Sequence, residues 1–107
     1  MTPPDLRQLL AQAEAVQQRL VEAQRELARR RLEASAGGGM VTAVATGEGR
    51  IAEVRIEPAL FASGDREMLQ DLIAAAVNSA LAEAQRVAGE ALQRAAGPAG
   101  QAGPRSG

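Results

Sequence analysis

The spacing of apolar residues changes at a run of three glycines, Gly37-Gly38-Gly39. Before the glycines, apolar residues recur with a seven-residue period, which is typical of a helix that packs against another helix. After them, apolar and polar residues alternate, which is typical of a β-strand. Each glycine costs a helix about 1 kcal/mol relative to alanine, so a helix should stop here. We interpret the glycines as a flexible hinge, with a possible short edge strand at residues 34–36.

The first helix is predicted to run from Asp5 to about Glu33. Pro3 and Pro4 precede Asp5, whose carboxylate can accept from the first free backbone N–H groups. Its apolar residues form a narrow seam, which favours packing against a helix of the same chain or of a second copy. The helix would be about 40 Å long at about 1.5 Å per residue, so part of it should project from so small a domain. The seam consists of Leu6, Leu9, Ala13, Val16, Leu20, Ala23, Leu27 and Ala34.

A β-hairpin is predicted to follow the glycines. Residues 40–46 alternate in polarity, Gly47-Glu48-Gly49 supply positive-φ positions for a tight turn, and residues 50–57 return. Pro58 ends the second strand because it has no N–H group to donate. An isolated hairpin is marginally stable in water, so a helix should cover it and a second copy should complete the core. Strict alternation places Ala52, Val54 and Ile56 on one face and Ile51, Glu53 and Arg55 on the other.

A second long helix is predicted to begin near Asp65, a plausible N-cap, and to end at Ala96. Its apolar stripe is broad at first, as if it covered a sheet, and then narrows, as if it packed against one helix. The simplest arrangement runs its end back along the start of the first helix, which would bring Arg94 near Arg7 and Arg86 near Arg19.

The predicted fold class is therefore α+β, with a long N-terminal helix, a small antiparallel sheet and a long C-terminal helix. Residues 1–96 should form one domain. Residues 97–107 are rich in Gly and Pro and have almost nothing to bury, so we expect a disordered tail without a functional site.

Composition excludes most enzyme classes, because the 107 residues include no His, Cys, Trp, Tyr or Lys. Metal sites built on imidazole or thiolate cannot form, and neither can a nucleophile activated by histidine. The carboxylates show no convergent pair. We therefore expect no enzyme, no metal and no cofactor. No apolar run approaches the roughly 20 residues that cross a bilayer, and the N-terminus lacks a secretion pattern, so we expect a cytoplasmic protein without membrane contact.

Three segments follow one another in this order: Gly39-Met40-Val41-Thr42-Ala43-Val44, Val54-Arg55-Ile56-Glu57-Pro58 and Glu67-Met68-Leu69-Gln70-Asp71-Leu72-Ile73-Ala74-Ala75-Ala76-Val77-Asn78. They resemble the YbaB/EbfC family of small bacterial nucleoid-associated proteins. The resemblance implies a homodimer in which helices project as paired arms from a central sheet core. It also implies binding to duplex DNA with little sequence demand, and hence a place in the nucleoid and a role in bacterial chromosome organisation. Together with the first helix, the likeness covers almost all of the chain except about the last ten residues.

Two groups of arginines are candidates for phosphate contacts. The formal net charge is −1 and the pI is near 5.5, whereas a nucleic-acid domain commonly has a pI above about 9, so any contact must come from local arrangement. One group is a cluster near the end of the first helix. The alternative interpretation of this cluster is an ordinary solvated helix end with ion pairs such as Glu26–Arg30 and Glu22–Arg25. The other group would contact DNA if the DNA lies at the tips of the arms. The first group is Arg25, Arg29, Arg30 and Arg31, and the second is Arg7, Arg19, Arg86 and Arg94.

A second function from a different class remains open. The chain could be a homodimeric adaptor whose projecting helices dock a replication or recombination protein, with DNA binding weak or absent. Phosphate binding would weaken steeply with salt, whereas docking at the helix seam would respond mainly to the loss of apolar residues such as Leu9 and Val16.

Overall fold

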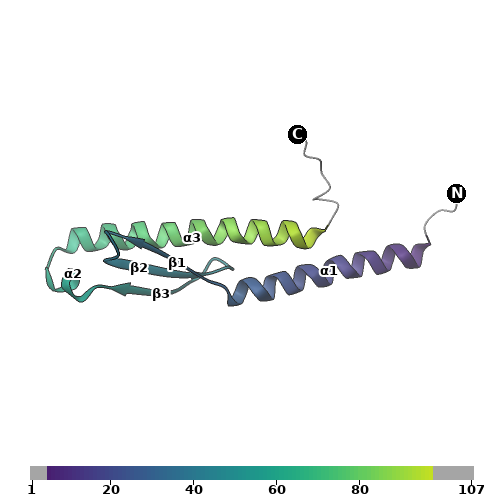
Figure 1. Ribbon diagram of the computed structural model, residues 1–107, viewed down its shortest axis with the longest axis horizontal. Coiled ribbons are helices and arrows are strands. Elements are labelled where there is room, and N and C mark those ends of the chain that lie inside the picture. The colour runs from purple at the N-terminus through teal and green to yellow at the C-terminus, as the bar shows by residue number, and fades with distance from the viewer. Residues whose placement is uncertain (1–4, 98–107) are drawn as a thin grey trace, which may run out of the picture.

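The computed structural model describes residues 5–97 and shows the expected α+β fold (Figure 1). The expected tail lies outside the described residues except for Gly97. A three-stranded antiparallel sheet lies at one end of the molecule, and two long helices extend from it. The elements in chain order are α1 (Leu6–Arg29), β1 (Arg31–Ala36), β2 (Val41–Thr46), β3 (Ile51–Ile56), α2 (Pro58–Ala62) and α3 (Arg66–Ala96).

Both expected N-caps are confirmed. The Asp5 side chain accepts from the backbone N–H of Arg7, and the Asp65 side chain accepts from that of Met68 at 3.0 Å. Each carboxylate satisfies a donor that the first helical turn leaves free, and each also carries the charge that the helix N-terminus favours.

The predicted end of α1 near Glu33 is wrong, because the helix stops at Arg29 and β1 begins at Arg31. Every β1 residue pairs with β2, from Arg31 opposite Thr46 to Ala36 opposite Val41. The ladder satisfies the backbone groups of these residues, and the extended chain buries Leu32. The possible edge strand is thus confirmed, but it is longer than residues 34–36.

The three glycines form the turn between β1 and β2 rather than a flexible hinge. Gly37, Gly38 and Gly39 have φ angles of 66°, 66° and 95°. Residues with a Cβ rarely adopt these angles, so three consecutive glycines allow the chain to reverse within a few residues. At Gly37, moreover, a Cβ would lie 2.8 Å from a methyl carbon of Leu72 on α3.

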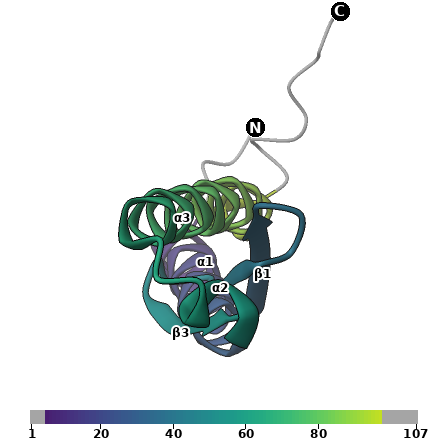
Figure 2. The ribbon, with the colours of Figure 1, turned by 90° about the vertical axis from the view of Figure 1, so that its left-hand side faces the viewer.

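The core lies between the central strand and α3, which crosses one face of the sheet (Figure 2). Alanines dominate this contact: Ala76, Ala80 and Ala84 of α3 are fully buried, as are Ala43 and Ala45 of β2. Such small side chains let the helix backbone lie close to the sheet. The helix packs mainly over β1 and β2 and much less over β3, which leaves Val54 of β3 partly exposed.

Ion pairs cover the opposite face of the sheet. Val44 lies there between Glu33 and Glu53 in the strand register, yet it is fully buried. Arg55 donates to both carboxylates at 2.9 Å and so spans the strand above Val44, and Arg31 donates to Glu53 at 2.9 Å. The hydrogen bond and charge of Glu33, together with those of Glu53, raise the pKa of Arg55 above its ordinary value.

Two local features differ from expectation. A register shift between Val44 and Ala45 brings Ile51 opposite Ala45, so strict alternation fails at the start of β3. In addition, Pro58 does more than end the strand, because it opens the short helix α2. Proline suits a first helical turn, where its missing N–H group would have no partner in the helix.

Gly47 fixes the β2–β3 turn against the end of α1. Its φ is not positive, contrary to expectation, and of the residues 47–49 only Gly49 has a positive φ, of 89°. The Gly47 N–H donates to the carbonyl of Leu27 at 2.9 Å, and a Cβ on Gly47 would lie 2.6 Å from that same oxygen. Glycine is therefore required for close approach.

We expect Gly47→Ala to lower the free energy of unfolding by about 1–3 kcal/mol, because the added methyl group meets fixed backbone. The matched control is Gly89→Ala in α3, where a Cβ meets nothing within 4 Å. That substitution should stabilise the protein by about 0.5–1 kcal/mol, since alanine is the better helix former. Urea unfolding of both variants and the natural chain measures the difference. Equal stabilities for the two variants would contradict the close contact at Gly47.

Candidate nucleic-acid interface

Helices α1 and α3 run antiparallel, and the second half of α1 packs beside the last turns of α3 (Figure 1). Arg19 Nε donates to the carbonyl of Ala95 at 3.2 Å, so α3 ends beside Arg19. The predicted approaches of Arg94 to Arg7 and of Arg86 to Arg19 are therefore wrong. The first half of α3 is used in covering the sheet, so only its second half reaches α1. Arg7 lies on a part of α1 that extends beyond the end of α3.

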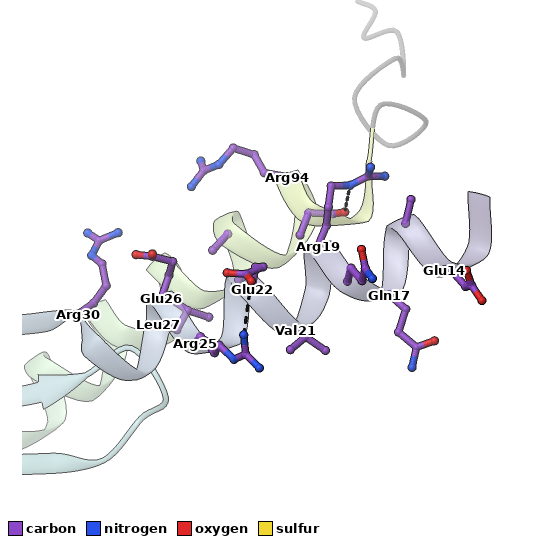
Figure 3. Close-up of a pocket in the computed structure, with 15 residues that line it drawn as sticks. Glu14, Gln17, Arg19, Val21, Glu22, Arg25, Glu26, Leu27, Arg30 and Arg94 are labelled. Carbon is purple, nitrogen blue, oxygen red and sulfur yellow. Dashed lines mark hydrogen bonds and ion pairs between the residues drawn. The ribbon is translucent and has the colours of Figure 1, made fainter. Parts of the chain in front are cut away.

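An open cleft of about 1410 Å³ lies between α1 and the end of α3 (Figure 3). Its lining contains more arginines than glutamates. Arg94 comes from α3, and the other charged side chains come from α1 and the residue that follows it. The charged lining residues are Arg19, Arg25, Arg30 and Arg94, together with Glu14, Glu22 and Glu26.

The structure divides the predicted cluster at the end of α1. Arg25 pairs with Glu22 at 3.5 Å, as expected, but Glu26 pairs with Arg29 at 3.1 Å instead of with Arg30. Arg31 is no longer helical, and its pair with Glu53 belongs to the outer face of the sheet. Three of the four arginines in this cluster are thus paired with carboxylates, and they do not form one surface.

Arg86 is also paired, and with two carboxylates. It donates to Glu83, one turn before it on α3, and to Glu90 at 3.0 Å, one turn after it. The hydrogen bond from Arg86 is the main reason that the pKa of Glu83 lies below its ordinary value, and the positive charges of Arg86 and Arg30 add to it. Because Arg86 is paired with two carboxylates, it contributes little net positive charge to the surface.

Four of the candidate arginines have no such partner. Within residues 5–97, no carboxylate oxygen lies within 4.0 Å of a guanidinium nitrogen in this group. Three of its members line the cleft, and Figure 3 shows their side chains extending toward the same side of it, whereas Arg25 points to the other side. The four are Arg7, Arg19, Arg30 and Arg94.

The cleft joins residues from both candidate groups, because Arg30 belongs to the first group and Arg19 and Arg94 belong to the second. The structure brings these three together because α3 returns beside α1. Arg50 and Arg66, which no sequence pattern singles out, also have no carboxylate within 4.0 Å in the described part of the chain. Arg50 lies at the β2–β3 turn and Arg66 begins α3, so neither belongs to the cleft.

The described residues offer arginines and carboxylates but no other obvious chemistry. Among residues 5–97, no three Asp or Glu side chains are grouped so that they could hold a metal ion. In the same part of the chain, none of the helices combines the length and the apolar character needed to cross a membrane. Phosphate contact is what the cleft can provide, since guanidinium groups match phosphate oxygens in geometry and charge.

Known proteins resemble this chain in sequence and in fold. A nucleoid-associated protein of Rhodococcus opacus is 42% identical over 100 residues, covering 94% of this chain and 88% of that one. A nucleoid-associated protein of Acetivibrio thermocellus is 47% identical over 83 residues, which cover 78% of this chain and 74% of that one. The crystal structure of an uncharacterized Helicobacter pylori protein has the same fold, with a TM-score of 0.76 at 19% sequence identity. The match covers 89% of this chain and 100% of that one. The profile of one family matches residues 1–99, and the chain therefore belongs to the YbaB/EbfC DNA-binding family.

Proposed function

We propose that this protein binds duplex DNA as a homodimer with little sequence specificity, through arginine contacts to phosphates from α1 and α3. The observation that carries the proposal is that some of the candidate arginines are paired with carboxylates and others are not. Arg19, Arg30 and Arg94 extend from one cleft without carboxylate partners in the described part of the chain. Arg7, farther along α1 and outside the cleft, is also unpaired within the described residues. The remaining candidates, Arg25, Arg29, Arg31 and Arg86, are each paired with a glutamate.

An unpaired arginine is the better phosphate ligand here. A paired guanidinium must give up its carboxylate or share it, and the glutamate then stays close enough to repel the phosphate. Residues 5–97 contain eleven arginines and thirteen acids, so long-range attraction to DNA is weak and binding depends on these local contacts. Phosphate contacts carry no direct sequence information, which fits chromosome coating better than recognition of a particular site.

Dimerisation is supported by apolar side chains at the end of the sheet that carries α2. Phe61 of α2 is 70% exposed, and Met40 and Met68 are also exposed. The two methionines line a hollow of about 630 Å³ together with Leu60. A second copy over this surface would bury apolar area that the single chain leaves in water, and would double the number of unpaired arginines.

The location in the cell follows from the ligand, so we place the protein in the cytoplasm, at the nucleoid.

The net negative charge of the described residues favours the second candidate, a homodimeric adaptor for a replication or recombination protein. DNA binding at low salt separates the two functions. A folded protein that binds no duplex even at low salt would support the adaptor.

We expect the triple variant Arg19→Gln/Arg30→Gln/Arg94→Gln to weaken duplex binding and to reduce its salt dependence. The slope of log K against log salt should fall by about 0.9 for each phosphate that the variant no longer binds. Titration of labelled duplex at several salt concentrations measures it, with unrelated duplex as competitor to test sequence preference.

The matched control is Arg25→Gln/Arg29→Gln/Arg31→Gln, which removes the same number of charges from paired residues. For this control, the slope of log K against log salt should change less than for the first triple variant. If the two triple variants lose equal affinity and slope, the distinction between paired and unpaired arginines is wrong. Circular dichroism of both variants verifies that each remains folded.

For dimerisation, we expect the natural chain to sediment at low micromolar concentration with twice its mass of 11.1 kDa. Phe61→Gln/Met68→Gln should shift it toward the monomer, because both changes place polar groups in the proposed interface. Val21→Gln replaces another exposed apolar residue, on α1, and should leave the dimer intact. A cooperatively unfolding 11.1 kDa monomer of the natural chain would refute this part of the proposal.

A further inference from the structure

The apolar seam of α1 is covered along only part of its length. Near the sheet, Leu27 is buried in the core, and midway along the helix Leu20 is partly buried. Beyond the end of α3 the seam continues, but Leu6 is 68% exposed and Leu9 is 47% exposed. We call residues 6–16 the α1 tip. It extends the seam used within the chain into a part of α1 that runs beyond the end of α3 (Figure 1), and of residues 6–16 only Val16, at the inner end, is partly buried.

We propose that the α1 tip pairs with the α1 tip of a second copy as a short antiparallel two-helix coiled coil. This contact is separate from the proposed dimer surface at α2, which lies at the other end of the molecule, and it does not depend on DNA binding (Figure 1).

The seam positions of the tip are self-complementary. Along the tip, successive seam residues follow one another by three, four and three positions, and this spacing is the same in both chain directions. The residues are Leu6, Leu9, Ala13 and Val16. In an antiparallel pair, Leu9 of one copy therefore meets Ala13 of the other, and Leu6 meets Val16. A large side chain thus faces a smaller one at each position, which suits close packing, and the two copies make identical contacts about a two-fold axis.

Charge does not oppose this pairing. The positions that flank the seam in the tip are occupied by Leu10 and Gln12, and Gln17 follows just beyond it. The charged residues Arg7 and Glu14 lie two positions from Leu9 and Val16, on the outer side of the helix. A second tip therefore meets no like charge at its flanks, and Leu10, which is 57% exposed, widens the apolar surface.

The tip is short, about 16 Å at 1.5 Å per residue, but it belongs to a helix of 24 residues that is already formed. Pairing therefore does not have to nucleate a helix. The small apolar area predicts weak association that grows with protein concentration.

Sedimentation equilibrium of the full chain over a range of concentrations tests the proposal. The average mass of the natural protein should increase with concentration, because copies associate through their tips. The variant Leu6→Gln/Leu9→Gln/Leu10→Gln should lack the increase in mass that tip pairing contributes. Glutamine is a good helix former, so the helix should survive. The control Val21→Gln alters an exposed apolar residue outside the seam, on the same helix, and should leave the gain unchanged.

The variant Phe61→Gln/Met68→Gln separates this contact from the dimer proposed above. It should remove association at the α2 end while the tips still pair, whereas the tip variant should retain the α2 dimer. If the tip variant and the natural chain have the same mass at every concentration, the proposal is wrong, whatever the outcome at α2.

Disulfide trapping tests the orientation, and the natural chain contains no cysteine that could interfere. Proteins carrying Leu9→Cys and Ala13→Cys are oxidised separately and as a mixture. Antiparallel pairing predicts that the mixed disulfide forms faster than either self-linked product. Faster self-linking of Leu9→Cys, or no linking above a Val21→Cys control, would overturn the antiparallel pair.

Discussion

Close packing of alanines between α3 and the central strand is the constraint on which the rest of the structure depends. Ala76, Ala80 and Ala84 follow one another at single-turn spacing and form one ridge along the helix. Because these side chains are so small, contact with Ala43 and Ala45 holds the helix close to the sheet. The direction of α3 is thereby fixed, and with it the place where its last turns meet α1. The cleft exists because the helix reaches that point and ends there.

This arrangement separates the arginines into two electrostatic environments. On the sheet, Arg31 and Arg55 are held by Glu33 and Glu53, where they also cover Val44 and help to keep the outer face polar. Along the cleft, the guanidinium groups of Arg19 and Arg30 have no carboxylate oxygen within 4.0 Å among the described residues. A chain with nearly balanced charge can thus present a local cationic surface. Net charge alone therefore does not describe how charge is distributed along this protein.

The core is thin, and larger apolar residues are left at both ends of an elongated molecule. Phe61, the single aromatic residue, lies exposed near one end, and Leu6 lies exposed near the other. The two proposed self-contacts would use these separate surfaces, and the cleft lies between them along the molecule (Figure 1). A chain that associates at both ends and contacts phosphates between them could link DNA-bound copies into larger assemblies, without requiring any of them to read a base sequence.

The sequence by itself determined the order of the two long helices and the β-hairpin between them, both N-caps and the family. These features depend on residues close together in the chain, such as Asp65 and the N–H of Met68 three residues later. Tertiary structure decided where α1 ends, how far α3 runs beside it and which arginines are paired. Those outcomes depend on contacts across long separations: Arg31 meets Glu53 from 22 residues away, and Arg19 meets Ala95 from 76. Local patterns cannot supply such contacts, because they form only when the sheet and α3 pack together.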